Sequence, residues 1–213
     1  MNKIDKNKQK KREALFDAAF HLFTSKGTHK TSISDIVDNA GVAKGTFYLY
    51  FKDKYDIRNK LIAHKSSEIF RKADFALRQT NICLLEEKVI FIIDNIINQF
   101  VTDKTLLEFI SKNLSWGVFK NILLEAGGDD EVDFYDIYHS VFEGAGKFRN
   151  PEVMVFMMIE LVGAVCYSAI LYSEPVGIEE LKPYLFRAVQ DIMTAHRTVE
   201  PTVSDSAQIG DCL

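Results

Sequence analysis

Residues 31–54 contain two short helical patterns separated by a glycine, and this arrangement restricts the possible folds more than any other feature of the chain. Ser32 is followed three residues later by Asp35, which is the spacing of a capping box at a helix N-terminus. Gly41 can adopt the left-handed backbone conformation that ends a helix and turns the chain sharply. Apolar residues recur between them at helical spacing on one face: Ile33, Ile36, Val37 and Ala40. The segment therefore predicts a helix, a tight turn and a second helix.

The second helix of this pair is predicted to begin near Ala43 and to contain about eight residues, a length of about 12 Å that fits the width of a DNA major groove. Phe47 and Phe51 are four residues apart and should face inward with Val42. The opposite side gathers Lys44, Gly45, Tyr48 and Leu49. A lysine donates to guanine O6 and N7 or to a phosphate, whereas a leucine offers only apolar contact, as with a thymine methyl. This surface has the composition of a DNA reader.

A longer signature surrounds the two helices. Its residues are Ala14-Leu15-Phe16-Asp17-Ala18-Ala19-Phe20-His21-Leu22-Phe23, Gly27, Thr31-Ser32-Ile33, Ile36, Ala40-Gly41-Val42, Lys44-Gly45-Thr46-Phe47-Tyr48, Tyr50-Phe51 and Lys54. This order of three helix patterns, two glycines and an aromatic-basic cluster resembles the DNA-binding signature of the TetR family of bacterial transcription regulators. The resemblance covers residues 14–54 of the 213.

The resemblance implies a homodimer that represses by occupying a palindromic operator and leaves it when a small molecule binds the C-terminal domain. It also implies that double-stranded DNA is contacted by Ser32, Ser34, Lys44, Gly45, Thr46, Tyr48, Leu49, Tyr50 and Lys54. Two positions depart from the family's pattern. Ala43 stands where a serine usually caps the recognition helix, and Leu49 is less polar than in many members. We therefore expect modest base readout.

The charge distribution supports a nucleic-acid partner independently of any motif. Residues 1–65 hold 14 Lys and Arg against 7 Asp and Glu, a net charge of +7, which leaves −11 for residues 66–213 and gives the overall −4. DNA phosphates would contact residues 1–65, so the charge of this basic part matters more for DNA binding than the overall charge. Its first twelve residues contain Lys3, Lys6, Lys8, Lys10, Lys11 and Arg12. This segment is either an arm that follows DNA or a solvated, disordered tail, and we favour the tail.

Composition favours one all-α chain. Hydrophobic residues make up 47% of the sequence, there are only four prolines, and no segment alternates in the manner of a β-strand. No secretory signal precedes residue 30, and Cys83, Cys166 and Cys212 form no paired spacing, so we expect free thiols in a cytoplasmic protein. The predicted domains are residues 1–52, an N-terminal arm and helix-turn-helix domain; 53–199, a connecting helix with a ligand-binding and dimerisation domain; and 200–213, a disordered tail.

Longer helices are predicted beyond residue 52. Asp53 with Asp56 caps a helix that continues to about Leu77 and could join the DNA-reading part rigidly to the rest of the chain. Further helical patterns cover residues 85–101, 103–113, 115–126, 133–144, 151–172 and 177–196. Pro183 either kinks the last helix or marks its first turn.

Residues 153–172 are almost all apolar and long enough to span a membrane. Glu160 near the centre and the following Glu174 and Pro175 oppose that interpretation. A helix that is apolar all round must instead be covered on both sides, by its own domain and by a second subunit. We assign to the dimer interface Val155, Ile159, Val162, Gly163, Cys166, Ile170, Leu181, Leu185, Ala188 and Ile192, as in a four-helix bundle.

An apolar effector cavity is predicted among the middle helices. Its candidate lining residues are Phe109, Trp116, Phe119, Tyr138, Met157, Glu160 and Tyr167. Glu160 would suit a cationic, lipophilic compound, although it could equally form a salt bridge or face solvent. No phosphate-binding glycine loop, nucleophile elbow or metal-ligand cluster is present, so we expect no enzyme activity, cofactor or metal. The alternatives are a nonspecific DNA-binding protein, or a helical carrier or enzyme that uses the basic part only for localisation.

Overall fold

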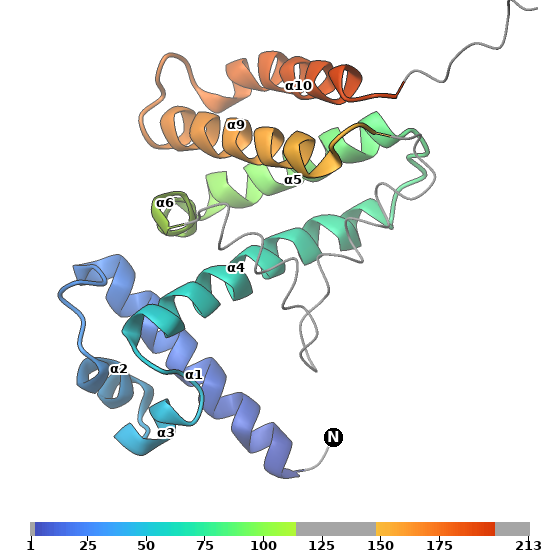
Figure 1. The fold of residues 1–213 in the computed structure, drawn as a ribbon. Coiled ribbons are helices and arrows are strands. Elements are labelled where there is room, and N and C mark those ends of the chain that lie inside the picture. The colour runs from blue at the N-terminus through green and yellow to red at the C-terminus, as the bar shows by residue number, and fades with distance from the viewer. Residues whose placement is uncertain (1–2, 114–147, 199–213) are drawn as a thin grey trace, which may run out of the picture.

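The helices separate into a small N-terminal group and a larger C-terminal group that are joined by one long helix (Figure 1). The computed structural model describes residues 3–113 and 148–198, which contain no strand beyond one isolated bridge between Phe148 and Arg197. The helices are α1 (Lys3–Lys26), α2 (Ile33–Ala40), α3 (Lys44–Tyr48), α4 (Lys54–Leu77), α5 (Leu85–Thr102), α6 (Lys104–Asn113), α9 (Pro151–Leu171) and α10 (Ile178–Ala195). The predicted all-α fold is confirmed.

We call α1, α2 and α3 the head. Its core is formed by apolar residues from all three helices together with the start of α4. The fully buried members include Leu15, Phe16, Ile36, Phe47, Phe51 and Ile57. The Phe51 ring packs against both Phe16 and Phe47, with centroids 5.3 and 5.5 Å away. Since aromatic contacts of this kind bury large apolar areas, they fix the short α3 against α1.

The N-terminal end of α1 differs from the expected disordered tail. The helix begins at Lys3 and runs without interruption for 24 residues. Lysine, glutamine, glutamate and arginine are all good helix formers, so the first turns extend the helix that Leu15 and Phe16 anchor in the core. The preference for a disordered tail at residues 3–12 was therefore wrong.

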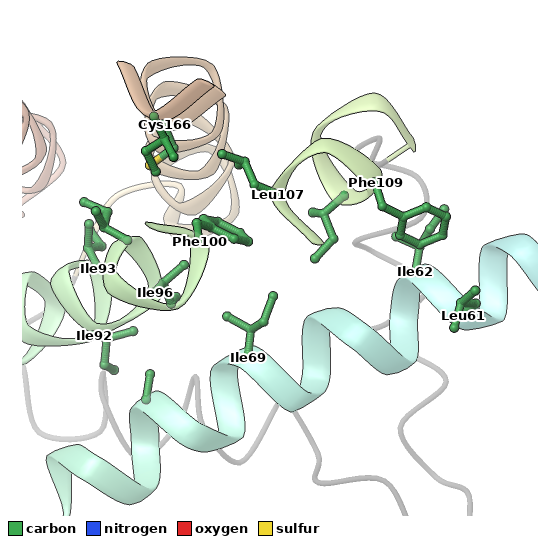
Figure 2. Packing of buried hydrophobic residues seen from close by; sticks show 14 of the residues in the cluster. Leu61, Ile62, Ile69, Ile92, Ile93, Ile96, Phe100, Leu107, Phe109 and Cys166 are labelled. Atoms are coloured by element: carbon green, nitrogen blue, oxygen red, sulfur yellow. The ribbon is translucent and has the colours of Figure 1, made fainter. Parts of the chain in front are cut away.

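The body comprises α5, α6, α9 and α10 with the second half of α4. Figure 2 shows Ile69 on α4 facing Ile92, Ile96 and Phe100 on α5, with Leu107 of α6 and Cys166 of α9 nearby. α4 is capped by Asp53, whose Oδ1 accepts hydrogen bonds from the Tyr55 and Asp56 amides at 2.7 and 2.9 Å. The predicted connecting helix is thus present with the expected cap and end.

The last two helices run where the sequence predicted them. α9 is long and apolar enough to cross a membrane, but it packs against α5, α6 and α10 and buries residues such as Met154 and Cys166. α10 begins at Ile178, which places Pro183 in its interior and not in its first turn. The helices predicted at 115–126 and 133–144 and the tail at 200–213 lie outside the described residues.

Candidate DNA-binding interface

The first helix of the predicted pair has the expected caps. The Ser32 Oγ accepts the Asp35 amide at 3.1 Å, and the Asp35 carboxylate accepts the Ser32 amide at 2.8 Å. Lys26 of α1 also donates to Asp35 at 2.9 Å. These bonds, with the Ser32 amide contributing most, lower the pKa of Asp35 from its ordinary value of 3.8 to about 2. At the other end, Gly41 has φ +65° and ends the helix in the left-handed conformation.

The second helix is shorter than the eight residues predicted. α3 contains five residues, and Ala43 at its N-cap makes no side-chain hydrogen bond. The chain then continues in a tight turn, because the Leu49 amide bonds to Thr46 O at 3.3 Å and the Phe51 amide to Phe47 O at 2.9 Å. The regular part of the reading helix therefore covers about 8 Å and not about 12 Å. The buried Phe51 draws the chain back into the core at this point.

α3 nevertheless presents the side that the sequence predicted. Lys44 and Gly45 are exposed, as are Tyr48 and Leu49, whose side chains are 54% and 79% exposed. A Cβ added at Gly45 would meet no atom within 4 Å, so no other part of the described chain occupies the space beside Gly45. Ser32 and Ser34 are exposed at the start of α2, while Thr46 and Tyr50 are half-buried. These residues form the candidate interface.

Lys54 has a structural role in addition to its predicted DNA contact. Its Nζ donates to three backbone carbonyls, those of Thr28, His29 and Thr31, at 3.1 to 3.3 Å. The side chain thereby holds the loop between α1 and α2 against the start of α4. The DNA contact of Lys54 stays a prediction, and it would compete with these bonds for the three protons of the ammonium group.

The structure adds a residue that sequence reasoning did not include. The ring of Tyr55, 43% exposed at the start of α4, has Lys54 Nζ and Arg58 Cζ over it at 5.5 and 5.6 Å from its centroid. Lys52 just before it is exposed. The signal in the sequence was the alternation of basic and aromatic residues, which continues past Lys54.

The predicted dimer stripe on α9 has the wrong orientation. Val155, Cys166 and Ile170 are buried within the protomer, and Leu185 on α10 is buried as well. Side chains that are already buried inside the protomer leave little surface for a partner. The other six residues of the predicted dimer interface are half-buried, and their contact with a second subunit stays a prediction: Ile159, Val162, Gly163, Leu181, Ala188 and Ile192. The opposite side of α9, with Met157, Glu160 and Ala164, is the one at the surface.

The four predicted ligand residues that the structure describes do not all lie in the interior of the body. Met157 and Glu160 are exposed on the outer side of α9, and Tyr167 is half-buried with its hydroxyl 3.4 Å from that of Tyr172. A cationic effector anchored inside the body by Glu160 therefore has no support. Phe109 is buried on α6 and packs edge-on against Phe20 of α1 at 5.3 Å, so it joins body to head. Trp116, Phe119 and Tyr138 lie outside the described residues.

The sequence of the head is similar to that of known DNA-binding proteins. Residues 15–61 match the sequence profile of the family described as bacterial regulatory proteins, tetR family. Residues 15–61 therefore form a DNA-binding domain of the TetR family. The fatty acid metabolism regulator protein of Bacillus subtilis (strain 168) is 35% identical over 74 residues, which is 35% of this chain and 38% of that relative. The matched segment thus spans little more than a third of the relative's length.

Two solved structures extend the likeness to the body's fold. The fatty acid degradation regulator FadR from Bacillus halodurans has a TM-score of 0.59 at 19% identity and covers 84% of this chain and 94% of its own. FadR from Bacillus subtilis, solved in complex with stearoyl-CoA, has a TM-score of 0.53 at 18% identity and covers 83% and 96%. At these identities the likeness shows the fold alone. The head carries most of the residues that match the TetR-family domain, and α2 and α3 are its helix-turn-helix.

Proposed function

We propose that the protein is a dimeric, cytoplasmic transcriptional repressor that binds a palindromic operator and is released by an apolar effector. The observation that carries the proposal is the capped α2, the left-handed Gly41 and the short α3, which together hold Lys44, Gly45, Tyr48 and Leu49 on one exposed surface. Family membership of the head supports the same conclusion.

On DNA, α3 would lie in the major groove. The Lys44 ammonium donates to guanine O6 and N7, and Leu49 contacts a thymine methyl. The hydroxyls of Tyr48 and Tyr50 donate to phosphate oxygens and fix the orientation of the helix. Because α3 is short and has one basic side chain, we expect few base contacts per half-site and a strong dependence on dimerisation.

Two contacts would transmit a change in the body to the head. α4 is continuous from the head to the body core, and Phe109 of α6 packs on Phe20 of α1. An effector that prefers a different position of α6 would therefore shift α1 and change the spacing of two heads that must match half-sites about 34 Å apart. By linkage, the effector then weakens DNA binding by the same factor as DNA weakens effector binding.

The dimer would use the outer sides of α9 and α10. Val153, Phe156, Met157 and Ala164 are exposed at helical spacing along α9, and Tyr184 on α10 is 75% exposed. Large apolar side chains on one exposed face are typical of a protein interface. We propose this face in place of the buried stripe predicted from the sequence.

The effector is proposed to contain a long apolar chain because a solved protein of the same fold is in complex with stearoyl-CoA. Stearoyl-CoA is therefore the first compound to add to a preformed protein–DNA complex. Release of the DNA at micromolar concentrations would support an acyl thioester as effector, and unchanged binding would exclude this compound as the effector.

Two substitutions on α3 test the DNA-reading role. Gly45→Ala adds a methyl group that meets nothing in the protein, so a loss of operator affinity without a loss of thermal stability would report close approach of DNA to this position. Lys44→Ala should weaken operator binding by about 1 to 3 kcal/mol if Lys44 reads a base. Lys72→Ala, exposed on the body half of α4, is the control. Unchanged affinity in both α3 variants would contradict the proposal.

A further inference from the structure

The first turns of α1 form a helical extension that the head's core does not require. α1 begins at Lys3, but its first residue buried in the core is Leu15. At a rise of 1.5 Å per residue, the part that precedes Leu15 is about 18 Å long. Figure 1 shows the free end of α1 at the same end of the molecule as α3, away from α9 and α10.

The extension carries a concentrated positive charge. Lys6, Lys8, Lys10 and Lys11 are exposed, and within the described part of the chain none of them forms an ion pair. Asp5 is the one acidic residue among residues 3–12. Like charges three and four residues apart on a helix repel each other, and an anionic partner would relieve this repulsion.

The composition of residues 3–12 indicates which anionic partner the extension binds. Ile4 is the one apolar residue among residues 3–12, so the extension has no apolar face for a protein groove or for insertion into a bilayer. Residues 3–11 form a rigid rod of about 14 Å. Such a rod runs beside about eight phosphates of a DNA duplex, which carries one charge per about 1.7 Å of helix axis. Lysine recognises phosphate as a point charge and requires no base edge.

We propose that residues 3–11 of α1 bind the DNA phosphate backbone outside the base pairs read by α3. The extension then adds affinity on any sequence, and the operator preference stays with α3. This inference rests on the proposed function, because it needs a head that is already placed on DNA. The acidic remainder of the chain, with a net charge of −11 over residues 66–213, makes such a contribution useful, since it repels DNA.

The test compares two proteins that lose the same charge from different places. One carries Lys6→Gln, Lys8→Gln, Lys10→Gln and Lys11→Gln. The control carries Arg71→Gln, Lys72→Gln, Lys88→Gln and Lys104→Gln on the second half of α4, on α5 and on α6. Glutamine keeps helix propensity, so far-UV circular dichroism should stay unchanged in both. Affinity is measured by fluorescence anisotropy between 50 and 300 mM salt, on DNA upstream of the protein's own gene and on a random 40-base-pair duplex.

We expect the α1 variant to bind both duplexes about tenfold or more weakly at 100 mM salt, with the ratio of the two affinities unchanged. Its slope of log affinity against log salt should fall by about 0.9 for each lysine that contacts a phosphate, and the control should keep the wild-type slope. An α1 variant that matches the wild type in affinity and slope, while the wild type still prefers the upstream DNA, would overturn the inference alone. Equal losses in the control would also overturn it.

Two further outcomes would point to a different role for the protein or for the extension. If the wild type shows no preference for upstream DNA, the proposed function fails, whatever the α1 variant does. If the variant keeps its DNA binding but loses binding to phosphatidylglycerol vesicles that the wild type binds, the extension serves a membrane surface and the inference is wrong.

Discussion

The imidazole of His64 on α4 stacks on the ring of Phe16 on α1, with centroids 5.0 Å apart and an interplanar angle of 25°. The His64 Nε2 also lies 3.6 Å from a Glu13 carboxylate oxygen on α1 and 3.7 Å from one of Glu68 on α4. Phe16 in turn packs on Phe51. This chain of contacts joins the connecting helix to the head directly behind α3, so it holds the reading helix at a fixed angle to α4.

Replacing His64 by alanine should lower the free energy of unfolding by about 1 to 2 kcal/mol, because it removes a largely buried ring from an aromatic contact. His64→Phe keeps the stacked ring and should recover more than half of that loss. Urea denaturation followed by circular dichroism measures both. A His64→Ala protein as stable as the wild type would mean that the stack does not hold the two helices together.

Lys54→Met should destabilise the head by about 1.5 to 3 kcal/mol, since three loop carbonyls lose a charged donor. Its effect on DNA separates the structural role from a phosphate contact. If Lys54 only holds the loop, the variant binds DNA more weakly with an unchanged salt dependence. If the slope of log affinity against log salt instead falls by about 0.9 per protomer, Lys54 contacts a DNA phosphate.

The stability of the head should depend on pH through Asp35. Its pKa in the folded protein is about 2, below its ordinary value of 3.8, so the ionised carboxylate stabilises the fold above about pH 4 and loses this effect as the pH falls toward 2. The stability difference between the wild type and Asp35→Asn should therefore shrink across that interval. Asp38→Asn on the same helix controls for the loss of one charge. A difference that is constant from pH 5 to pH 2 would contradict this account.

Met157→Lys should convert the proposed dimer into monomers, because it places a charge on the proposed apolar face of α9. Val101→Lys is a close control, since Val101 on α5 is also 42% exposed but lies on another surface. Sedimentation velocity at several protein concentrations compares the two. Dimers in both variants would place the interface elsewhere.

Local rules predicted the head well. The capping box at Ser32, the left-handed Gly41 and the cap at Asp53 each depend on residues within a few positions of one another, and all three are present. The inward direction of Phe47 and Phe51 follows from helical spacing alone. The length of α3 was overestimated, because its end is set by how Phe51 packs on Phe16, which is a tertiary contact.

The body shows where sequence periodicity stops being informative. α9 is apolar on nearly every side, so its pattern does not distinguish the face toward α5 and α6 from the face toward solvent. The stripe containing Val155 and Cys166 was assigned outward and lies inward, while Met157 and Glu160 lie outward. The packing of neighbouring helices decides this orientation, and no local signal encodes it.

Fluorescence anisotropy of the wild-type protein on DNA upstream of its own gene, against a random duplex of equal length across a salt series, tests the central claim most directly. A TetR-type operator reader should bind the upstream DNA at least about a thousandfold more tightly than the random duplex, with log affinity falling linearly against log salt on both. Equal affinity for the two DNAs would contradict a sequence-reading role for α3 and leave a nonspecific DNA-binding protein.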